Sequence, residues 1–335
     1  MRLLRTEWTR LFARRFTRIT LVLILLVLAL IGVAVGYSSH QHTAATLAAA
    51  RVEAQHIREE SEAARQRCLD AHKNPSANNR EFPPGMNCDD LTTGQPDAND
   101  LQPYQFSFRM QASDLVVLLG ALLALFGFAV GASFIGAEWS SGGLTNLLLW
   151  RPRRLPLLLG KLGTLLLGVL SVGVVLSAAW IAAVWGIAKV RGDAGGVTPG
   201  LLRSLALTDT RALALGLFAA AVGFGVASLG RHTATALGVA VGYVVVLEIG
   251  ARIVLSLIQI TRPERFLLSN YVAAWLVKAV PFYDDSACRQ PTFGAVSCEP
   301  VRWYVHMNQG AVAGGTLLLV VLGAALFAFR RRDVT

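Results

Sequence analysis

Two features of the sequence place charged side chains where they could do chemistry. The first is Glu248 and Arg252, which lie four positions apart in an apolar run and share a face if that run is helical. A charge facing lipid at the bilayer centre costs on the order of 2.5 to 3.5 kcal/mol, so the two are expected to face protein or a wet cavity. Two interpretations stay open: a self-neutralising pair that fixes helix packing, or part of a substrate path.

The second feature is the segment from Gly136 to Leu162, GAEWSSGGLTNLLLWRPRRLPLLLGKL. It opens with an acidic–aromatic pair, continues with a Leu-rich stretch from Leu144 to Trp150, and ends in a basic turn with proline. A membrane protein without its own energy chemistry needs such a short element, tied to two spans, if an outside motor is to move it. The alternative is an ordinary basic connecting loop beside an interfacial helix.

Several enzyme motifs are missing from the sequence. Gly160-Lys161 is followed by Leu162 and lacks the glycine-rich turn of a phosphate-binding loop, so the chain is not expected to hydrolyse ATP alone. The sequence also lacks a HExxH pair, a GxSxG elbow and an aspartate pair inside an apolar run. An enzyme acting inside the membrane is therefore the weakest of the functional classes considered.

The elements that must position these residues are long apolar runs. Of the 335 residues, 54% are hydrophobic and only 16% are charged, more apolar surface than a soluble core of this size can bury. A helix of roughly 20 apolar residues crosses the hydrocarbon core. The sequence predicts an all-α polytopic membrane protein with six spans: Ile19 to Tyr37, Leu115 to Ala137, Leu162 to Ile187, Ala212 to Leu229, Thr235 to Ile258 and Ala311 to Phe329.

The basic residues predict how the chain is oriented. An arginine-rich leader (1–18) precedes the first span, and Arg330-Arg331-Arg332 follows the last, so both termini are expected in the cytoplasm. A cleaved signal peptide is the alternative for the leader, but its length and the length of the first span favour a retained anchor. The net charge of +10 does not indicate nucleic-acid binding, because the basic residues lie at the ends of the apolar runs.

This orientation divides the connecting segments between the two sides of the membrane. The tail 330–335 and the loop 138–161 are expected inside, whereas segments 38–112, 188–211 and 259–309 are expected outside. Thr43 to Lys73 lacks Gly and Pro and predicts a helix whose small-residue seam needs a partner, while Asn74 to Pro103 predicts irregular chain. Phe266 to Phe282 could form a seventh span, but the polar residues within it favour a re-entrant or interfacial helix.

All four cysteines, Cys68, Cys88, Cys288 and Cys298, fall in the segments predicted to lie outside. Thiols outside a bacterial membrane tend to oxidise, so two disulfides are expected. Three connectivities are possible, and Cys68 with Cys88 and Cys288 with Cys298 require the least long-range closure. No metal site is expected, because close CxxC spacing and a convergent histidine set are missing.

Three glycine pairs at a spacing of four indicate tight helix packing. They are Gly127 with Gly131, Gly238 with Gly242, and Gly310 with Gly314. Two glycines on one helix face allow another backbone to approach closely.

The segment after the second predicted span resembles the coupling loop of permease subunits of type-2 ATP-binding-cassette exporters, and actinobacterial members in particular. The matching residues are Glu138, Gly143, Leu144, Thr145, Leu147, Leu148, Pro152, Arg153, Arg154, Gly160 and Lys161. Glu-Trp-x-Arg-Leu near the start and Phe-Arg-Arg-Arg-Asp-Val at the end are also similar. Gly142-Gly143-Leu144 departs from the commoner Gly-Thr-Leu, which affects the expected docking contacts.

The resemblance implies six spans, an amphipathic N-terminal connecting helix and a coupling helix that docks onto a separate ATPase. The residues it assigns to coupling are Glu138, Trp139, Gly143, Leu144, Arg151, Pro152, Arg153 and Arg154. It implies no cofactor in this chain, with ATP and Mg²⁺ bound by two copies of the ATPase. The other implied partners are membrane lipid and a second permease, identical or related, in the plasma membrane of a bacterium. A different class, a membrane-anchored sensor or assembly protein with a disulfide-stapled exterior, stays as the alternative, and the residues single out no substrate.

Overall fold

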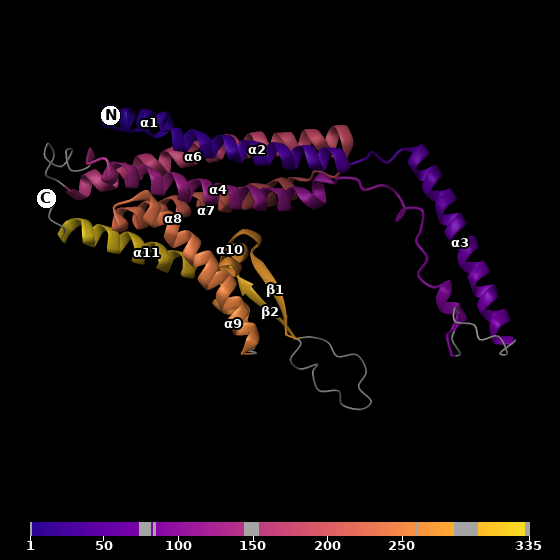
Figure 1. The fold of residues 1–335 in the computed structure, drawn as a ribbon. Helices are drawn as coiled ribbons and strands as arrows, with labels where there is room; N and C mark the ends of the chain where they lie inside the picture. The colour runs from indigo at the N-terminus through magenta and orange to yellow at the C-terminus, as the bar shows by residue number, and fades with distance from the viewer. Residues whose placement is uncertain are drawn as a thin grey trace. The chain divides into compact units, whose positions relative to one another are not determined.

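The computed structural model describes residues 2–73, 82, 85–143, 154–258, 260, 262–284 and 301–331, and within these ranges the side chains of 2–6, 154 and 284 are left undescribed. The chain forms two compact units. Unit 1 comprises Met1–Ile31, Arg109–Val184 and Gly196–Thr335, and unit 2 comprises Gly32–Phe108 and Trp185–Gly195. Each unit is described by itself below (Figure 1).

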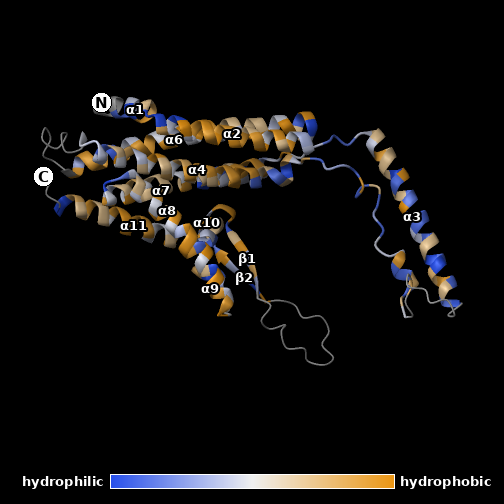
Figure 2. Cartoon of the chain, in the orientation of Figure 1, coloured by the Kyte–Doolittle hydropathy of each residue, from blue (hydrophilic) through white to orange (hydrophobic). Residues whose placement is uncertain are grey.

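Six helical segments within the described residues are long and apolar enough to cross a membrane, as predicted. They are α2 (Arg15–Ser38), α4 (Phe108–Ser140), α6 (Arg154–Arg191), α7 (Pro199–Gly230), the run Thr233–Leu257 and α11 (Met307–Arg331). Hydrophobic residues predominate in these segments, whereas α3 (Ala44–Lys73) mixes hydrophilic and hydrophobic residues along its length (Figure 2).

The fourth span begins earlier than its apolar residues indicate. Thr198 caps the start of α7 by accepting a hydrogen bond from the Leu201 backbone N–H at 3.3 Å, and Pro199 occupies the first helical position. Much of the segment predicted as the outer loop 188–211 is therefore helical. Hydropathy marks the membrane-spanning part of a helix and not its ends.

Glycines bring α4 and α7 into close contact in unit 1. A Cβ atom added at Gly127 would lie 2.2 Å from the Gly216 carbonyl oxygen, and one at Gly131 would lie 2.2 Å from that of Ala220. The predicted tight packing is therefore found at this pair. Around Gly238 and Gly242, by contrast, no described atom lies within 4 Å of an added Cβ.

The N-terminal leader forms a separate short helix. Helix α1 (Arg2–Ala13) ends before Arg14, and α2 begins at Arg15. Leu11 is 1% exposed and packs over Gly168 of α6, where an added Cβ would approach its side chain to 2.3 Å. The break differs from the single helix expected over residues 1–18, and it leaves Arg15 exposed while Arg14 turns into the protein.

The fifth span changes its helical winding. Helix α8 (Thr233–Gly242) passes into the π-helix η2 (Tyr243–Gly250), and α9 (Ala251–Leu257) completes the span. Stretches of π-helix are rare and frequently mark functional sites. Of the two charged residues singled out from the sequence in this span, Glu248 lies within η2 and Arg252 lies in α9.

The segment before the last span departs from a wholly helical fold. After the short helix η3 (Pro263–Phe266), α10 (Leu268–Val277) has ten residues, too few to cross a membrane. Lys278, with φ of +73°, ends α10, and β1 (Ala279–Asp284) pairs antiparallel with β2 (Val301–His306) from Ala279 opposite His306 to Asp284 opposite Val301. Within the described residues, the fold is helical apart from this hairpin. Strand β1 occupies the end of the helix predicted from 266 to 282.

In unit 2, the chain after α3 returns along the small-residue seam of that helix. Ala50, Ala54 and Cys68 are buried on the seam. The returning chain includes the short helix η1 (Cys88–Leu91), and ion pairs join Arg58 to Asp97 at 3.1 Å and Arg65 to Asp89 at 2.8 Å. The partner that the seam requires is therefore supplied by the same chain.

Candidate functional site

A buried ammonium group holds together three distant parts of unit 1. Lys161 of α6 has a side chain that is only 2% exposed, and its Nζ lies 3.0 Å from Oε1 of Glu7 in α1 and 2.8 Å from Oε2 of Glu138 in α4. A buried charge without a partner costs several kcal/mol, so two carboxylates around one ammonium satisfy Lys161.

Arg14, in the break between α1 and α2, completes this group. Its guanidinium donates to Oε1 of Glu138 at 3.1 Å and to the carbonyl oxygens of Ser133 and Phe134 at 2.8 and 2.9 Å. Burial lowers the pKa of Arg14, although Glu138 and Glu7 oppose this change. We call Glu7, Arg14, Glu138 and Lys161 the charge cluster; its two acids and two bases balance.

An aromatic ring and a peripheral arginine adjoin the charge cluster. The Phe134 ring centroid lies 5.0 Å from the Arg14 guanidinium and 5.7 Å from the Lys161 ammonium. Arg10 approaches Oε1 of Glu7 at 3.5 Å from the surface, whereas Oε2 of Glu7 is buried without a hydrogen-bond partner in the described part of the chain. The carboxylates and the face of the Phe134 ring therefore both stabilise the cations of Arg14 and Lys161.

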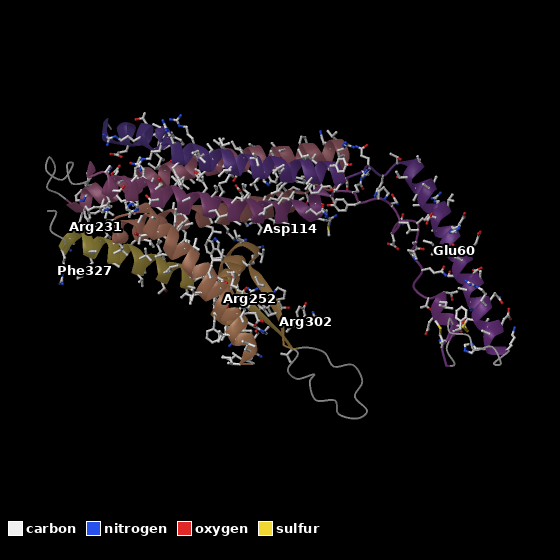
Figure 3. The ribbon with its side chains drawn as sticks, viewed as in Figure 1. Glu60, Asp114, Arg231, Arg252, Arg302 and Phe327 are labelled. Atoms are coloured by element: carbon white, nitrogen blue, oxygen red, sulfur yellow. A yellow bond between two sulfur atoms is a disulfide. The ribbon has the colours of Figure 1, made fainter. Side chains whose placement is uncertain are left out.

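Trp139, next to Glu138, connects α4 to two further segments. Its ring meets that of Phe329 in α11 edge-on, with centroids 5.9 Å apart. The guanidinium of Arg231, in the turn between α7 and α8, lies over the indole at 5.1 Å, and Figure 3 labels Arg231 at this turn. Residues from four other parts of the sequence therefore contact Glu138 or Trp139, close to the end of α4 at Ser140.

The predicted coupling residues are only partly within the described chain. Glu138 and Trp139 lie in the contacts above, and Gly143 follows the turn after α4, where Gly142 has a φ of +70°. Leu144, Arg151, Pro152 and Arg153 lie outside the described residues, and Arg154 begins α6 without a described side chain. The charge cluster thus lies on both sides of the segment 144–153 in the sequence, with Glu138 before it and Lys161 after it.

The comparison with protein families identifies the chain. A family model described as "ABC-2 family transporter protein" matches residues 1–334. The chain belongs to the ABC-2 transporter family. It is thus a multi-pass permease subunit of an ATP-binding-cassette transporter and partners an ABC ATPase subunit. The chain matches no curated protein sequence at a significant level.

The intramembrane charges of the permease, Glu248 and Arg252, are held differently from the pair that the sequence suggests. The carboxylate of Glu248 accepts hydrogen bonds from the backbone N–H of Ser269 at 2.9 Å, from its hydroxyl at 2.7 Å, and from the hydroxyl of Tyr243. Arg252 is exposed on α9 (Figure 3), and no ion pair within 4 Å joins these two described side chains. Glu248 therefore caps the first turn of α10 and connects it to the π-helix.

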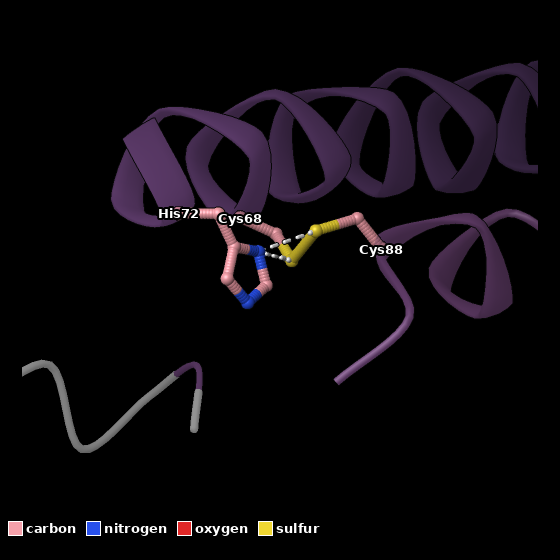
Figure 4. Close-up of side chains that lie close together, drawn as sticks. All are labelled: Cys68, His72 and Cys88. Atoms are coloured by element: carbon pink, nitrogen blue, oxygen red, sulfur yellow. Dashed lines mark hydrogen bonds between the residues drawn. A yellow bond between two sulfur atoms is a disulfide. The ribbon is translucent and has the colours of Figure 1, made fainter. Parts of the chain in front are cut away.

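The predicted disulfide between Cys68 and Cys88 is present in unit 2, with a Cα–Cα distance of 5.7 Å. His72 lies beside it, with Nδ1 3.2 Å from Sγ of Cys88 and 3.7 Å from Sγ of Cys68 (Figure 4). The three side chains are close enough to hold a metal ion, but bonded sulfurs offer no thiolate ligand. Cys288 and Cys298, predicted to form the second disulfide, lie outside the described residues.

Sequence reasoning identified Glu138 but not its partners. Glu7 and Lys161 were noted only within family-like motifs, and Arg14 only as one of several leader arginines. The one available signal is that Glu7 is the only acidic residue in the leader 1–18. The hydrogen bond from Lys161 to Glu7 joins positions 154 residues apart, so no local spacing reveals it.

Proposed function

We propose that this permease is the membrane-spanning subunit of an ATP-driven exporter in which the charge cluster passes movement from the ATPase to the spans. ATP and Mg²⁺ bind to two ATPase copies, and the permease pairs with a second permease, identical or related. Closure of the ATPase pair displaces the loop 144–153. Because α4 and α6 meet through Glu138 and Lys161, they move together with α1 as one body.

The burial of Lys161 between Glu7 and Glu138 is the observation that carries this proposal. The desolvated ion pairs clamp the two helix ends that border the loop to the N-terminal helix. If α4 and α6 could move separately, displacement of the segment 144–153 would be lost in bending of the chain. Because their ends are held together, the displacement is transmitted to both helices. Desolvated pairs resist separation because a parted charge stays buried without a partner.

The arrangement of the chain ends supports a cytoplasmic position for this loop. Arg14, directly after α1, contacts Glu138, and Phe329 near the end of α11 contacts Trp139, so both ends of the described chain lie beside the end of α4. The basic residues Arg330 and Arg331 close α11. The positive-inside rule then assigns both termini and the loop to the side where the ATPase binds ATP.

Three spans with few buried residues support pairing with a second permease. Within the described residues, the apolar window of the fifth span has no buried residue, and those of the first and sixth have few. A second permease on the fifth span would also cover Arg252, which is exposed there. Lipid alone would leave this charge facing hydrocarbon.

Copurification of the ATPase tests the proposed docking. The full chain is solubilised in detergent and captured by an affinity tag, and the bound proteins are assayed for ATP hydrolysis. Replacing Arg153 and Arg154 together with Glu is expected to reduce the captured ATPase, and more so at higher salt if the contact is exposed. The matched control is Arg51→Glu with Arg203→Glu, which makes the same change in charge at two exposed positions away from the segment.

Two outcomes would contradict the proposal. Equal ATPase capture by the Arg153/Arg154 variant and by its control would make the loop an ordinary basic connector. Ligand binding by the exterior of a chain that never captures an ATPase would favour the sensor or assembly alternative.

A further inference from the structure

Unit 1 also contains an apolar cavity, and the residues that line it are separate in sequence from the charge cluster. The cavity has a volume of about 210 Å³ and lies between α7, α10 and α11, three helices that contact one another (Figure 1). Its walls include Phe218 of α7, Tyr271 and Trp275 of α10, and Gly314 and Gly315 of α11. Every lining side chain is apolar, aromatic or absent.

The polar tips of the two aromatic residues are engaged elsewhere. The Trp275 indole N–H donates to the Arg211 carbonyl oxygen at 3.0 Å, and the Tyr271 hydroxyl donates to the Arg265 carbonyl oxygen at 2.8 Å. These contacts leave the ring bodies to form the wall. A cavity with this lining offers water few hydrogen-bond partners and suits a hydrocarbon chain.

The size and openness of the cavity fit part of a chain molecule. Pockets that take whole drug-sized ligands measure roughly 300 to 1,000 Å³, so this cavity suits a segment of a longer ligand. No described atom lies within 4 Å of a Cβ added at Gly315, so α11 leaves a path on that side. An acyl chain can enter there from the surrounding membrane.

A basic and aromatic surface adjoins the cavity through Tyr271. Arg265, which holds the Tyr271 hydroxyl, is exposed and stands over the Trp303 ring at 4.9 Å, and Arg262 stands over the same ring at 5.8 Å. Glu264 between them leaves one net positive charge. Arg and Trp together are typical of the membrane–water interface, and guanidinium groups bind phosphate oxygens in pairs.

We propose that this is a binding site for an anionic membrane phospholipid, with an acyl chain in the cavity and its phosphate at Arg265. The occupant is a lipid and not a second protein because a small apolar cavity adjoins exposed positive charge. The site is independent of ATP-driven export. A bound lipid would fasten α10, and with it the Glu248 cap, to α7 and α11.

Photocrosslinking in lipid nanodiscs tests the site directly. The full-length permease is reconstituted with a trace of phosphatidylglycerol that carries a photoactivatable group on its acyl chain, and crosslinked peptides are mapped. Labelling is expected in the cavity-lining parts of α7, α10 and α11. Excess unlabelled phosphatidylglycerol should reduce it several-fold, whereas excess phosphatidylcholine should reduce it much less.

Matched variants assign the two halves of the site. Gly315→Phe obstructs the open side of the cavity and should lower cavity labelling several-fold, whereas Gly323→Phe should not, because Gly323 is a second open glycine on α11 outside the cavity. Arg265→Gln should keep labelling but remove the preference for phosphatidylglycerol.

Three results would overturn the proposal. One is labelling spread evenly over all spans, which would indicate lipid that only surrounds the protein. A second is unchanged cavity labelling in Gly315→Phe, and a third is equal competition by the two lipids in the unmodified protein.

Discussion

Two carboxylates of the permease, Glu138 and Glu248, are stabilised by different means. Glu138 binds the cations of Lys161 and Arg14 from two other segments, and the Lys161 side chain is 2% exposed. Glu248 is half-buried and, among the described residues, accepts hydrogen bonds from hydroxyl and backbone donors, while the arginine one turn away is exposed. A carboxylate is thus held by whichever segments fold against it, and a residue of opposite charge on the same helix face is not necessarily its partner.

The difference predicts a large loss of stability at Lys161. Replacing Lys161 with Met leaves Glu7 and Glu138 buried without their shared cation, which is expected to cost on the order of 3 to 5 kcal/mol. Thermal unfolding of the solubilised protein measures the effect. Adding Glu7→Gln should recover much of it, since the pair of Glu138 and Arg14 then remains balanced. Lys189→Met, at an exposed lysine, is the control. A loss of stability in Lys161→Met no greater than in this control would contradict the claim that Glu138 depends on a buried cation.

At Glu248, removing the hydroxyl donor Ser269 is expected to lower the stability of the protein. Ser269→Ala removes the 2.7 Å hydrogen bond to the carboxylate and is expected to cost about 1.5 to 3 kcal/mol, the usual contribution of a hydrogen bond to a charged group. Ser256→Ala is the matched control, because its hydroxyl donates only to the carbonyl of Ile253 in its own helix. Equal unfolding temperatures for the two variants would show that Ser269 does not hold Glu248.

Geometry as well as charge should matter at Arg14. Arg14→Lys keeps the positive charge but cannot reproduce the guanidinium contacts to two carbonyl oxygens and Glu138, so a loss of about 1 to 2 kcal/mol is expected. Arg15→Lys, at the exposed neighbouring position, should change the unfolding temperature little. If both variants behave alike, charge alone explains the role of Arg14.

The smallest effect is expected at Arg252. Because this exposed arginine has no ion pair with Glu248, Arg252→Leu should change the free energy of unfolding by less than about 1 kcal/mol in the solubilised permease. A loss as large as that of Lys161→Met would restore the interpretation of Glu248 and Arg252 as a structural pair.

The sequence predicted those features that depend on local composition. Hydropathy located all six spans, and the position of the cysteines predicted the link between Cys68 and Cys88. It missed the hairpin of β1 and β2, whose strands are brought together across a long connection, and it missed the extent of α7, which depends on the cap at Thr198.

The partners of the candidate site were beyond local reasoning. Glu138 was identified from its place beside the loop, but the contacts from Arg14 to Glu138 and from Lys161 to Glu7 span 124 and 154 residues. Such pairs arise only when separate helices pack. Glycine spacing has the same limit, since the pair in α4 packs tightly and the pair in α8 meets no described neighbour.

The most direct test of force transmission through the charge cluster is a distance measurement in the complex with the ATPase. Spin labels are placed at Met110→Cys of α4 and Leu207→Cys of α7, both exposed positions of unit 1, with Cys288 and Cys298 replaced by Ser. With Glu138 intact, adding ATP should change the distance between the labels. Glu138→Lys should abolish that change while the complex stays assembled and still hydrolyses ATP, and Glu138→Gln, a milder change, should reduce it. An ATP-driven distance change of full size in both variants would contradict the account.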